Sequence, residues 1–239
     1  MKLSGASSAE VLEFLRVVPL FSKINGSTAR NLATQCHFRH FDKGERIFHE
    51  SDMAECAFLV RSGKISIILN STDGRELVID EMRPGDILGE VGLLTRTSHT
   101  ASAVARTHCE VLALPRELFL RMIDDEPVLA RRILDVTAHR LQRSAVRETA
   151  LAFLDAQARL ARYLLALEAE EHDKGYVTAS QEDLARGTGL IRQTVAKVLG
   201  RWRRDGWLLT GRGRVLLLNR KALEQIERGD ISVSLVSPR

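Results

Sequence analysis

The sequence is poor in the features that mark secreted and membrane proteins. Its three cysteines, Cys36, Cys56 and Cys109, are odd in number and form no C-x-x-C pair, which excludes a disulfide framework and a zinc or iron–sulfur signature. We expect them to be small buried side chains. No apolar run approaches the roughly 18 residues that span a bilayer, and the N-terminus lacks a secretory signal pattern. These absences predict a protein of the reducing cytoplasm, with no membrane partner.

Signatures of common enzymes are also absent. The sequence contains no P-loop, no ordered Ser/His/Asp set and no metal-binding spacing, so we expect neither catalysis nor a bound metal. It has no internal repeat and no low-complexity segment. Its 239 residues suffice for two modest domains, since a single core is typically built from about 100 to 150 residues.

Positive charge is concentrated at one end of the chain. From Lys174 onward there are thirteen basic residues against six acidic ones, a net charge of +7. The whole chain carries +4, which leaves −3 for the residues before Lys174. Such asymmetry is typical of a chain whose C-terminal part meets nucleic acid, although a solvated charged face would look the same.

Between Cys36 and Pro115 the sequence alternates with period two and is interrupted by turn dipeptides. The strand-like runs are 36–41, 45–50, 56–63, 64–70 and 76–82. Several short strands at this spacing favour an antiparallel barrel or roll. The preceding segment, 8–21, is typical of an amphipathic helix packed on that roll.

After Pro115 the periodicity becomes helical. Pro127 suits the first turn of a helix, and the pattern continues from there for about seven turns to residue 154. One stripe of this helix contains Ile133, Val136 or Thr137, Leu141, Ser144 and Glu148. A helix of this length favours a partner beyond its own domain, which predicts a dimer seam. The alternative is a helix packed along its own barrel.

These patterns divide the chain into three parts. We expect a sensor roll over 1–126, a dimerisation helix and hinge over 127–154, and a DNA-binding domain over 155–239. Asp155 can cap a further helix that starts at Ala156. The last residues, 231–239, are typical of a frayed tail.

The segment from Val177 to Asn219 has the pattern of a helix-turn-helix followed by a wing. Ser180 with Asp183 predicts the start of a short helix that stops between Gly187 and Gly189. A second helix follows, and its inner face is apolar. That face consists of Val195, Val198, Leu199 and Trp202.

The opposite face of the second helix carries Arg192, Gln193 and Lys197. Arginine matches guanine O6 and N7, and glutamine matches adenine N6 and N7, so these side chains suit base reading. A hairpin turning at 211–213 would bring Arg212 and Arg214 to phosphates. The full candidate DNA-binding set is Arg192, Gln193, Lys197, Ser180, Gln181, Thr194 and Arg212. The alternative for the two cations on the helix is an ordinary solvated face.

The order of roll, long helix and winged helix-turn-helix resembles the CRP/FNR family of bacterial transcription regulators. The resemblance covers about residues 12–228 and rests on four runs in family order. They are PGD-x-x-GE-x-GLL (84–94), CEVLALPRELF (109–119), RLQ before LAFLD (140–155) and G-x-x-RQTV (189–195). It implies an α+β fold with a cyclic-nucleotide-binding-like jelly roll. It also implies a homodimer on pseudo-palindromic double-stranded DNA and contact with RNA polymerase.

In members that bind cyclic nucleotides, the loop after Gly-Glu cradles the phosphate. The resemblance places Gly89, Glu90, Val91 and Thr100 in that loop, with Glu90 on the ribose hydroxyl and Thr100 on the phosphate. It brings Arg140 and Ser144 of the long helix to the sugar and base, Ser144 from the partner. Two positions depart from the family: His99 stands where the phosphate-binding arginine is expected, and Ala145 replaces a hydroxyl residue.

Histidine has a reference pKa near 6.5 and is mostly neutral at cytoplasmic pH, so it supplies no fixed charge for a buried phosphodiester. Three interpretations follow for this loop. His99 is a surface or packing residue in a pocket that holds no nucleotide; the effector is another anion, such as a cyclic dinucleotide, with Arg96 supplying the charge; or cAMP or cGMP binding is retained. No other cofactor is predicted.

The recognition helix departs from the family as well. Ile191 stands where a capping serine is usual, and Gln193 where glutamate is usual. Since glutamate accepts from cytosine N4, Gln193 predicts a different half-site at that base pair. The sequence thus predicts a DNA-binding transcription regulator gated by its roll. Two rivals stay open: a cyclic-nucleotide-responsive signalling module that acts on proteins, and a barrel enzyme with converging acids or histidines.

Overall fold

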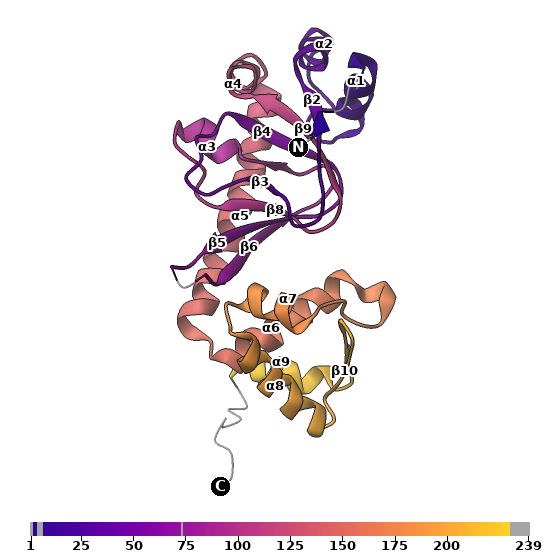
Figure 1. The fold of residues 1–239 in the computed structure, drawn as a ribbon, viewed down its shortest axis with the longest axis vertical. Helices are drawn as coiled ribbons and strands as arrows, with labels where there is room; N and C mark the ends of the chain where they lie inside the picture. Colours follow the sequence, from indigo (N-terminus) through magenta and orange to yellow (C-terminus); the bar gives the residue numbers. More distant parts are fainter. Residues whose placement is uncertain (1, 4–6, 73, 230–239) are drawn as a thin grey trace. The chain divides into compact units, whose positions relative to one another are not determined.

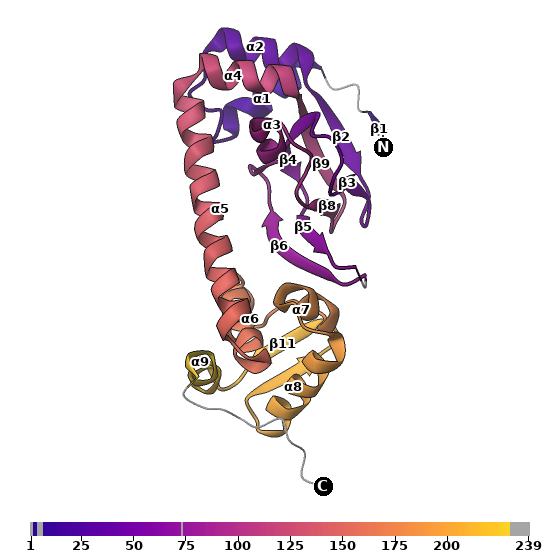
Figure 2. The ribbon, with the colours of Figure 1, turned by 90° about the vertical axis from the view of Figure 1, so that its left-hand side faces the viewer.

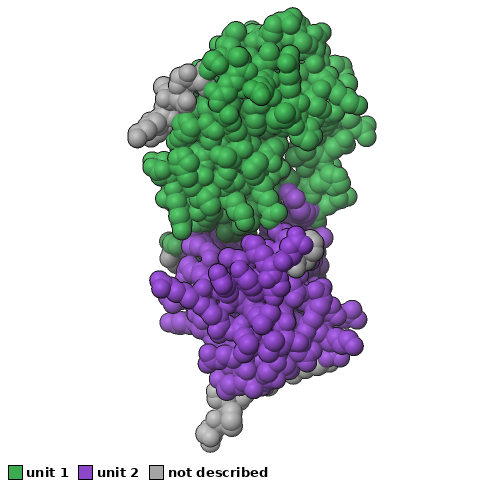
Figure 3. Space-filling view, turned by 90° about the vertical axis from the view of Figure 1, so that its right-hand side faces the viewer, with its two compact units in different colours: residues 1–74, 78–142 green, residues 75–77, 143–239 purple. Residues whose placement is uncertain are grey.

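The computed structural model describes residues 2–3, 7–72 and 74–229, so the predicted frayed tail, 231–239, lies outside the described residues. The chain folds as two compact units (Figure 1, Figure 3). The first unit contains residues 1–74 and 78–142, and the second contains residues 75–77 and 143–239. The predicted start of the last domain at residue 155 falls at the break between the helices that end at Phe153 and begin at Ala156, whereas the two units divide after residue 142.

The first unit consists of two antiparallel sheets with helices around them. The helices are α1 (Ser8–Val17), α2 (Gly26–Gln35), α3 (Glu90–Thr95), α4 (Arg116–Asp125) and the first part of α5 (Pro127–Phe153). One sheet has the order β1 (Lys2–Leu3), β2 (His37–Phe41), β9 (Cys109–Pro115), β4 (Cys56–Ser62), β7 (Ile87–Leu88). The other has the order β3 (Arg46–Phe48), β8 (Ser102–Ala105), β5 (Ile65–Asn70), β6 (Glu76–Met82). This arrangement confirms the predicted α+β class with an antiparallel roll.

Each of the five predicted strand-like runs forms a strand, but the sequence pattern missed the two-residue strands β1 and β7 and the longer β8. The segment that follows the predicted effector loop forms β8, whose four residues are all buried. β8 pairs with β5 from Ile68↔Ser102 to Ile65↔Ala105. Small residues fill β8 because it lies between two neighbours, β3 and β5, in the middle of its sheet.

The N-terminal helix packs on the roll as predicted but ends early. Val11 and Leu15 are buried in the same core as Phe38 of β2. The helix ends at Val17, because the residue before Pro19 is pushed into extended backbone. A further helix that the periodicity did not predict, α2, follows at 26–35.

Helix α5 spans 27 residues, which confirms the predicted long helix (Figure 2). The predicted seam requires a correction, because Ile133 is 3% exposed and packs in the core of its own unit. The outward apolar side chains of α5 include Leu134, 62% exposed, and Leu141, 71% exposed. Ala138 and Ala145, at helical spacing from them, are exposed too.

The second unit is helical with one hairpin. Besides the end of α5 it contains α6 (Ala156–Glu170), a 3-10 turn η1 (His172–Lys174), α7 (Gln181–Thr188), α8 (Arg192–Arg204), β10 (Leu208–Gly211), β11 (Arg214–Leu217) and α9 (Arg220–Arg228). Asp155 caps α6 as predicted, accepting from the N–H of Ala158. Trp202 is buried at the centre of the core, with the Trp207 ring 6.5 Å away. Within the described ranges, no helix combines the length and apolar character needed to cross a membrane.

Candidate nucleic-acid interface and effector cradle

The first helix of the predicted helix-turn-helix begins with a capping box, as its sequence indicated. The Ser180 hydroxyl accepts from the N–H of Asp183, and the Asp183 carboxylate accepts from the N–H of Ser180. Burial alone would raise the pKa of Asp183, but hydrogen bonds from Ser180 and the Arg186 guanidinium lower it on balance. Asp183 is therefore a carboxylate at neutral pH, as favoured at a helix N-terminus.

Glycines let the two helices and their neighbours approach closely. α7 ends at Gly189, whose φ of 68° lies in the left-handed region that glycine tolerates. A Cβ at Gly187 would lie 2.1 Å from Cζ of Tyr163 on α6, so only glycine fits there. The turn between α7 and α8 is fixed by packing on α6.

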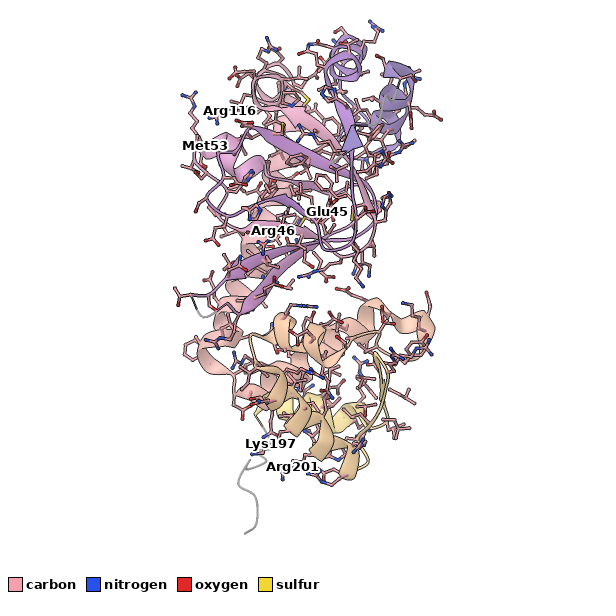
Figure 4. All side chains as sticks on the ribbon, in the orientation of Figure 1. Glu45, Arg46, Met53, Arg116, Lys197 and Arg201 are labelled. Carbon is pink, nitrogen blue, oxygen red and sulfur yellow. The ribbon has the colours of Figure 1, made fainter. Side chains whose placement is uncertain are left out.

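Helix α8 has one buried and one exposed face. Val195, Val198, Leu199 and Trp202 are buried, as predicted. On the other side, Arg192, Gln193 and Lys197 are exposed. Figure 4 shows the Lys197 and Arg201 side chains on the outer side of the helix. The helix begins after Ile191, whose side chain has no oxygen to accept from the first N–H groups.

The predicted wing is a hairpin formed by β10 and β11. Its strands pair from Leu208↔Leu217 to Gly211↔Arg214, so Arg212 and Gly213 form a two-residue turn. Gly213 has a φ of 69°, which its lack of a Cβ permits. Arg212 and Arg214 are both exposed. β10 packs beside α8 (Figure 1).

A groove of about 480 Å³ lies between α7, α8 and the hairpin. Its lining includes Ser180, Gln181, Arg192, Gly211 and Arg214. The structure thus brings together predicted DNA-binding residues from three elements. The other predicted residues, Gln193, Lys197, Thr194 and Arg212, are not among its lining residues. Gln193 and Lys197 are exposed and Thr194 is half-buried on α8, while Arg212 lies at the hairpin tip.

In the first unit, two of the predicted effector-binding residues contact each other. Arg140 of α5 donates to the Glu90 carboxylate at 2.5 Å. The Glu90 side chain is 2% exposed and that of Arg140 18% exposed. Arg140 also donates to the carbonyl of Ile87, and its Nε lies 3.7 Å from Asp80. The charge of Arg140 is thus matched by protein groups.

His99 is a packing residue in this structure. It is buried, and its ring stacks on Phe48 with 3.7 Å between centroids. A Cβ at Gly89 would lie 3.3 Å from Cε1 of His99, so the ring also lies against this glycine. Burial lowers the pKa of His99 below its usual value, against a smaller opposing effect of Asp52. The imidazole is therefore neutral at pH 7, as the sequence predicted.

Apart from Gly89, against which the His99 ring lies, the other predicted effector-binding residues take no part in the Arg140–Glu90 pair or the His99–Phe48 stack. Gly89 precedes α3 with a φ of 81°, in the left-handed region. Val91 and Thr100 are exposed, and Arg96 is exposed with a φ of 57°. Ser144 donates to Glu148 on the next turn of α5.

The cysteines are free, and two of the three match the expected burial. Cys36 and Cys109 are buried, whereas Cys56 is half-buried. Burial raises the pKa of Cys36 to about 12, so its thiol stays protonated. Among the residues described, no three or more histidine, cysteine, aspartate or glutamate side chains are grouped to hold a metal ion.

One residue that the sequence analysis did not single out belongs to the wing. The Tyr176 ring lies under the guanidinium of Arg214, 4.8 Å from its centre to Cζ. The sequence offers no periodic signal for this contact, because residues 176–178 join the hairpin through a single isolated bridge. An antiparallel roll with a Gly-Glu loop, joined to a winged helix-turn-helix, defines a DNA-binding regulator of two units.

Comparison with known proteins supports this class. Residues 38–126 match the cyclic nucleotide-binding domain family, and residues 158–226 match the Crp-like helix-turn-helix domain family. The chain is 32% identical to the cyclic AMP receptor protein of Thermus thermophilus over 80% of this chain and 88% of that protein. It is 28% identical to the CRP-like cAMP-activated global transcriptional regulator of Mycobacterium tuberculosis, over 90% of this chain and 99% of that one.

A solved structure, that of the c-di-GMP responsive global regulator CLP of Xanthomonas campestris, is similar with a TM-score of 0.74 and 28% identity. The similarity covers 81% of this chain and 99% of that one. The chain belongs to the CRP/FNR family of transcription regulators. The DNA-binding prediction is thereby confirmed over the rival module that acts on proteins.

Proposed function

We propose that this regulator binds its operator as a homodimer and reads each half-site with Arg192, Gln193 and Lys197. The observation that carries the proposal is the division of α8, whose apolar face is buried and whose polar and basic face is exposed. A helix of this kind enters the major groove with its N-terminal residues at the base edges. Gln193 lies in that first turn and pairs with adenine.

Backbone contacts come from the elements around α8. Ser180 and Gln181 lie at the N-terminus of α7, Thr194 lies on α8, and Arg212 lies at the hairpin tip. Helix N-termini and exposed arginines are the usual donors to phosphate oxygens. These contacts set the register of the protein on DNA and carry no sequence information of their own.

The proposed dimer forms through the outward side of α5. Leu134 and Leu141 are two turns apart and largely exposed, with Ala138 between them. An apolar a/d-type row on a long helix is the usual seam of a two-helix coiled coil. The family resemblance implies contact with RNA polymerase, and we include that contact in the proposal. We also propose that the protein acts by binding and not by catalysis.

For the roll, we propose that ordinary binding of a cyclic mononucleotide is lost. His99 is neutral and packed, and Arg140 already pairs with Glu90, so neither offers a charge to a phosphodiester. A buried anion without a charged partner is unstable. Arg96 is exposed beside α3 and is the cation that a bulkier anion would meet, and the similar regulator CLP responds to c-di-GMP.

A DNA titration tests both the proposed DNA interface and the proposal for the roll. The full-length protein is titrated against a labelled random-sequence duplex at several salt concentrations, alone and with cAMP, cGMP or cyclic di-GMP. We expect affinity to fall steeply with salt, with a slope of about −0.9 for each neutralised phosphate. Salt-independent binding, or none, would refute the DNA interface. A response to cAMP at micromolar concentration would refute the proposal for the roll.

A further inference from the structure

The loop before α7 pairs with the hairpin of the second unit through one isolated β-bridge. The N–H of Val177 donates to the carbonyl of Val215 at 2.7 Å, and the N–H of Val215 donates to the carbonyl of Val177 at 2.9 Å. Both side chains are buried in the core of this unit. The loop is therefore joined to β11 by hydrogen bonds and by packing.

The rest of this loop is also held. Glu171 accepts from the N–H of Thr178 at 2.7 Å and from Nζ of Lys174 at 3.0 Å. Burial alone would raise the pKa of Glu171, but these hydrogen bonds lower it on balance, so the carboxylate is charged at neutral pH. Gly175 adopts a φ of 69° in the turn between these contacts. The backbone on both sides of Tyr176 is therefore held in place.

Tyr176 places its ring against a cation of the wing. Cζ of Arg214 lies 4.8 Å from the ring centre, within the roughly 6 Å of a cation–π contact. Arg214 is exposed, and Tyr176 is half-buried. A planar guanidinium can stack on a ring and still direct N–H groups outward. Arg214 also lines the groove that contains Arg192 of the recognition helix.

We infer that Tyr176 is a positioning residue, which holds the Arg214 guanidinium beside the groove for contact with a DNA phosphate. The inference rests on the proposed DNA interface and adds a role that the wing arginines alone do not reveal. A free arginine loses much rotamer freedom when it binds, and an arginine already stacked on a ring has less to lose. The ring contributes affinity through Arg214 and makes no base contact of its own.

The test is a double-mutant cycle on the full-length protein. Tyr176→Leu removes the ring, Tyr176→Phe keeps it, and Arg214→Ala removes the cation. Each is titrated against a random-sequence duplex of about three helical turns, roughly 10 base pairs each. We expect Tyr176→Leu to raise Kd two- to fivefold for each half-site, the equivalent of about 0.5–1 kcal/mol. Tyr176→Phe should bind like the wild type.

The salt dependence and the cycle separate positioning from damage to the fold. Arg214→Ala should lower the salt slope by about one for each half-site. In the Arg214→Ala background, Tyr176→Leu should change Kd no further. The inference would be overturned if Tyr176→Leu weakened DNA binding equally in both backgrounds, or did not weaken it at all. Arg192→Ala is the control for the DNA interface itself, and it should weaken binding in either case. If the wild type shows no salt-dependent binding, the proposed DNA interface fails and the inference falls with it.

Discussion

A guanidinium nitrogen of Arg140 lies 2.5 Å from a carboxylate oxygen of Glu90, joining the long helix α5 to the short helix α3 of the roll. The family resemblance predicted that both residues bind an effector, and in the structure they form an ion pair with each other. Because the Glu90 side chain is almost fully buried, the opposite charge of Arg140 at this distance offsets part of the cost of burying a carboxylate. A ligand that used either side chain would have to share it with this pair.

The pair should contribute strongly to the stability of the roll. Glu90→Gln leaves the Arg140 guanidinium without its closest charge, and we expect a loss of about 1–3 kcal/mol in the free energy of unfolding. Urea denaturation followed by circular dichroism measures it. Asp80→Asn is the matched control: Asp80 is 3.7 Å from Arg140 and more exposed, so its loss should stay below about 1 kcal/mol. Equal losses would argue against the buried pair as the stronger contact.

His99 should make the roll sensitive to acid. Its folded pKa lies below its usual 6.5, so below that pH the unfolded chain binds more protons than the folded chain. Its contribution to stability is therefore complete above about pH 6.5 and is lost as pH falls towards the folded pKa. His99→Phe keeps a stacking ring that cannot titrate. Urea midpoints that fall with acid in the wild type, and less in this variant, are expected; parallel curves would contradict the assignment.

Gln193 should set the base preference at one position of the half-site. The wild type is expected to select adenine there, and Gln193→Glu should shift selection to cytosine, whose N4 amino group donates to a carboxylate. Binding-site selection from a randomised duplex pool reads out both. Each correct bidentate pair discriminates by about 1–3 kcal/mol. The expectation fails if both proteins recover the same half-site.

A capping side chain at the start of the recognition helix α8 should increase the stability of the second unit. Ile191 has φ −78° and ψ 146°, the extended backbone of a capping residue, and its side chain is 47% exposed. Ile191→Ser should therefore stabilise the second unit by about 0.5–2 kcal/mol, and Ser180→Ala should destabilise it by a similar amount. Thermal unfolding compares the two. No gain from the serine would show that the helix N-terminus is satisfied in another way.

The outward row on α5 should control association. Leu141→Glu places a charge in the proposed seam and is expected to convert the dimer to a monomer in sedimentation equilibrium. Val17→Glu is the matched control, because Val17 on α1 is equally exposed at 72% and lies off α5. A dimer that survives Leu141→Glu, or dissociates equally with Val17→Glu, would argue for another interface.

Regular periodicity predicted most of the fold, and tertiary contacts decided the rest. Five strands of the roll, β2 to β6, followed from local pattern, as did the length of α5 and the capping box at Ser180. The residues of the dimer seam could not be predicted from local pattern, because Ile133 and Leu134 are neighbours and only packing shows which of them faces the core. The role of Tyr176 was missed for the same reason, since its partner lies 38 residues away in sequence.

The cradle was the least predictable part. The sequence showed that His99 replaces an arginine but left three interpretations open. The stack on Phe48 joins residues far apart in the sequence, and the approach of Gly89 to His99 depends on how the chain folds through α3 between them, so no local pattern could reveal either contact. They favour the packing interpretation.

The two tryptophans of the chain, Trp202 and Trp207, both belong to the second unit and pack together there. Indole emission excited selectively over tyrosine therefore reports on the DNA-reading unit alone. Combined with circular dichroism, which sees both units, it lets an experimenter follow the melting of each half in the intact, unlabelled protein. Tryptophan thus serves as an intrinsic fluorescent probe of the DNA-binding unit, and the roll contains none.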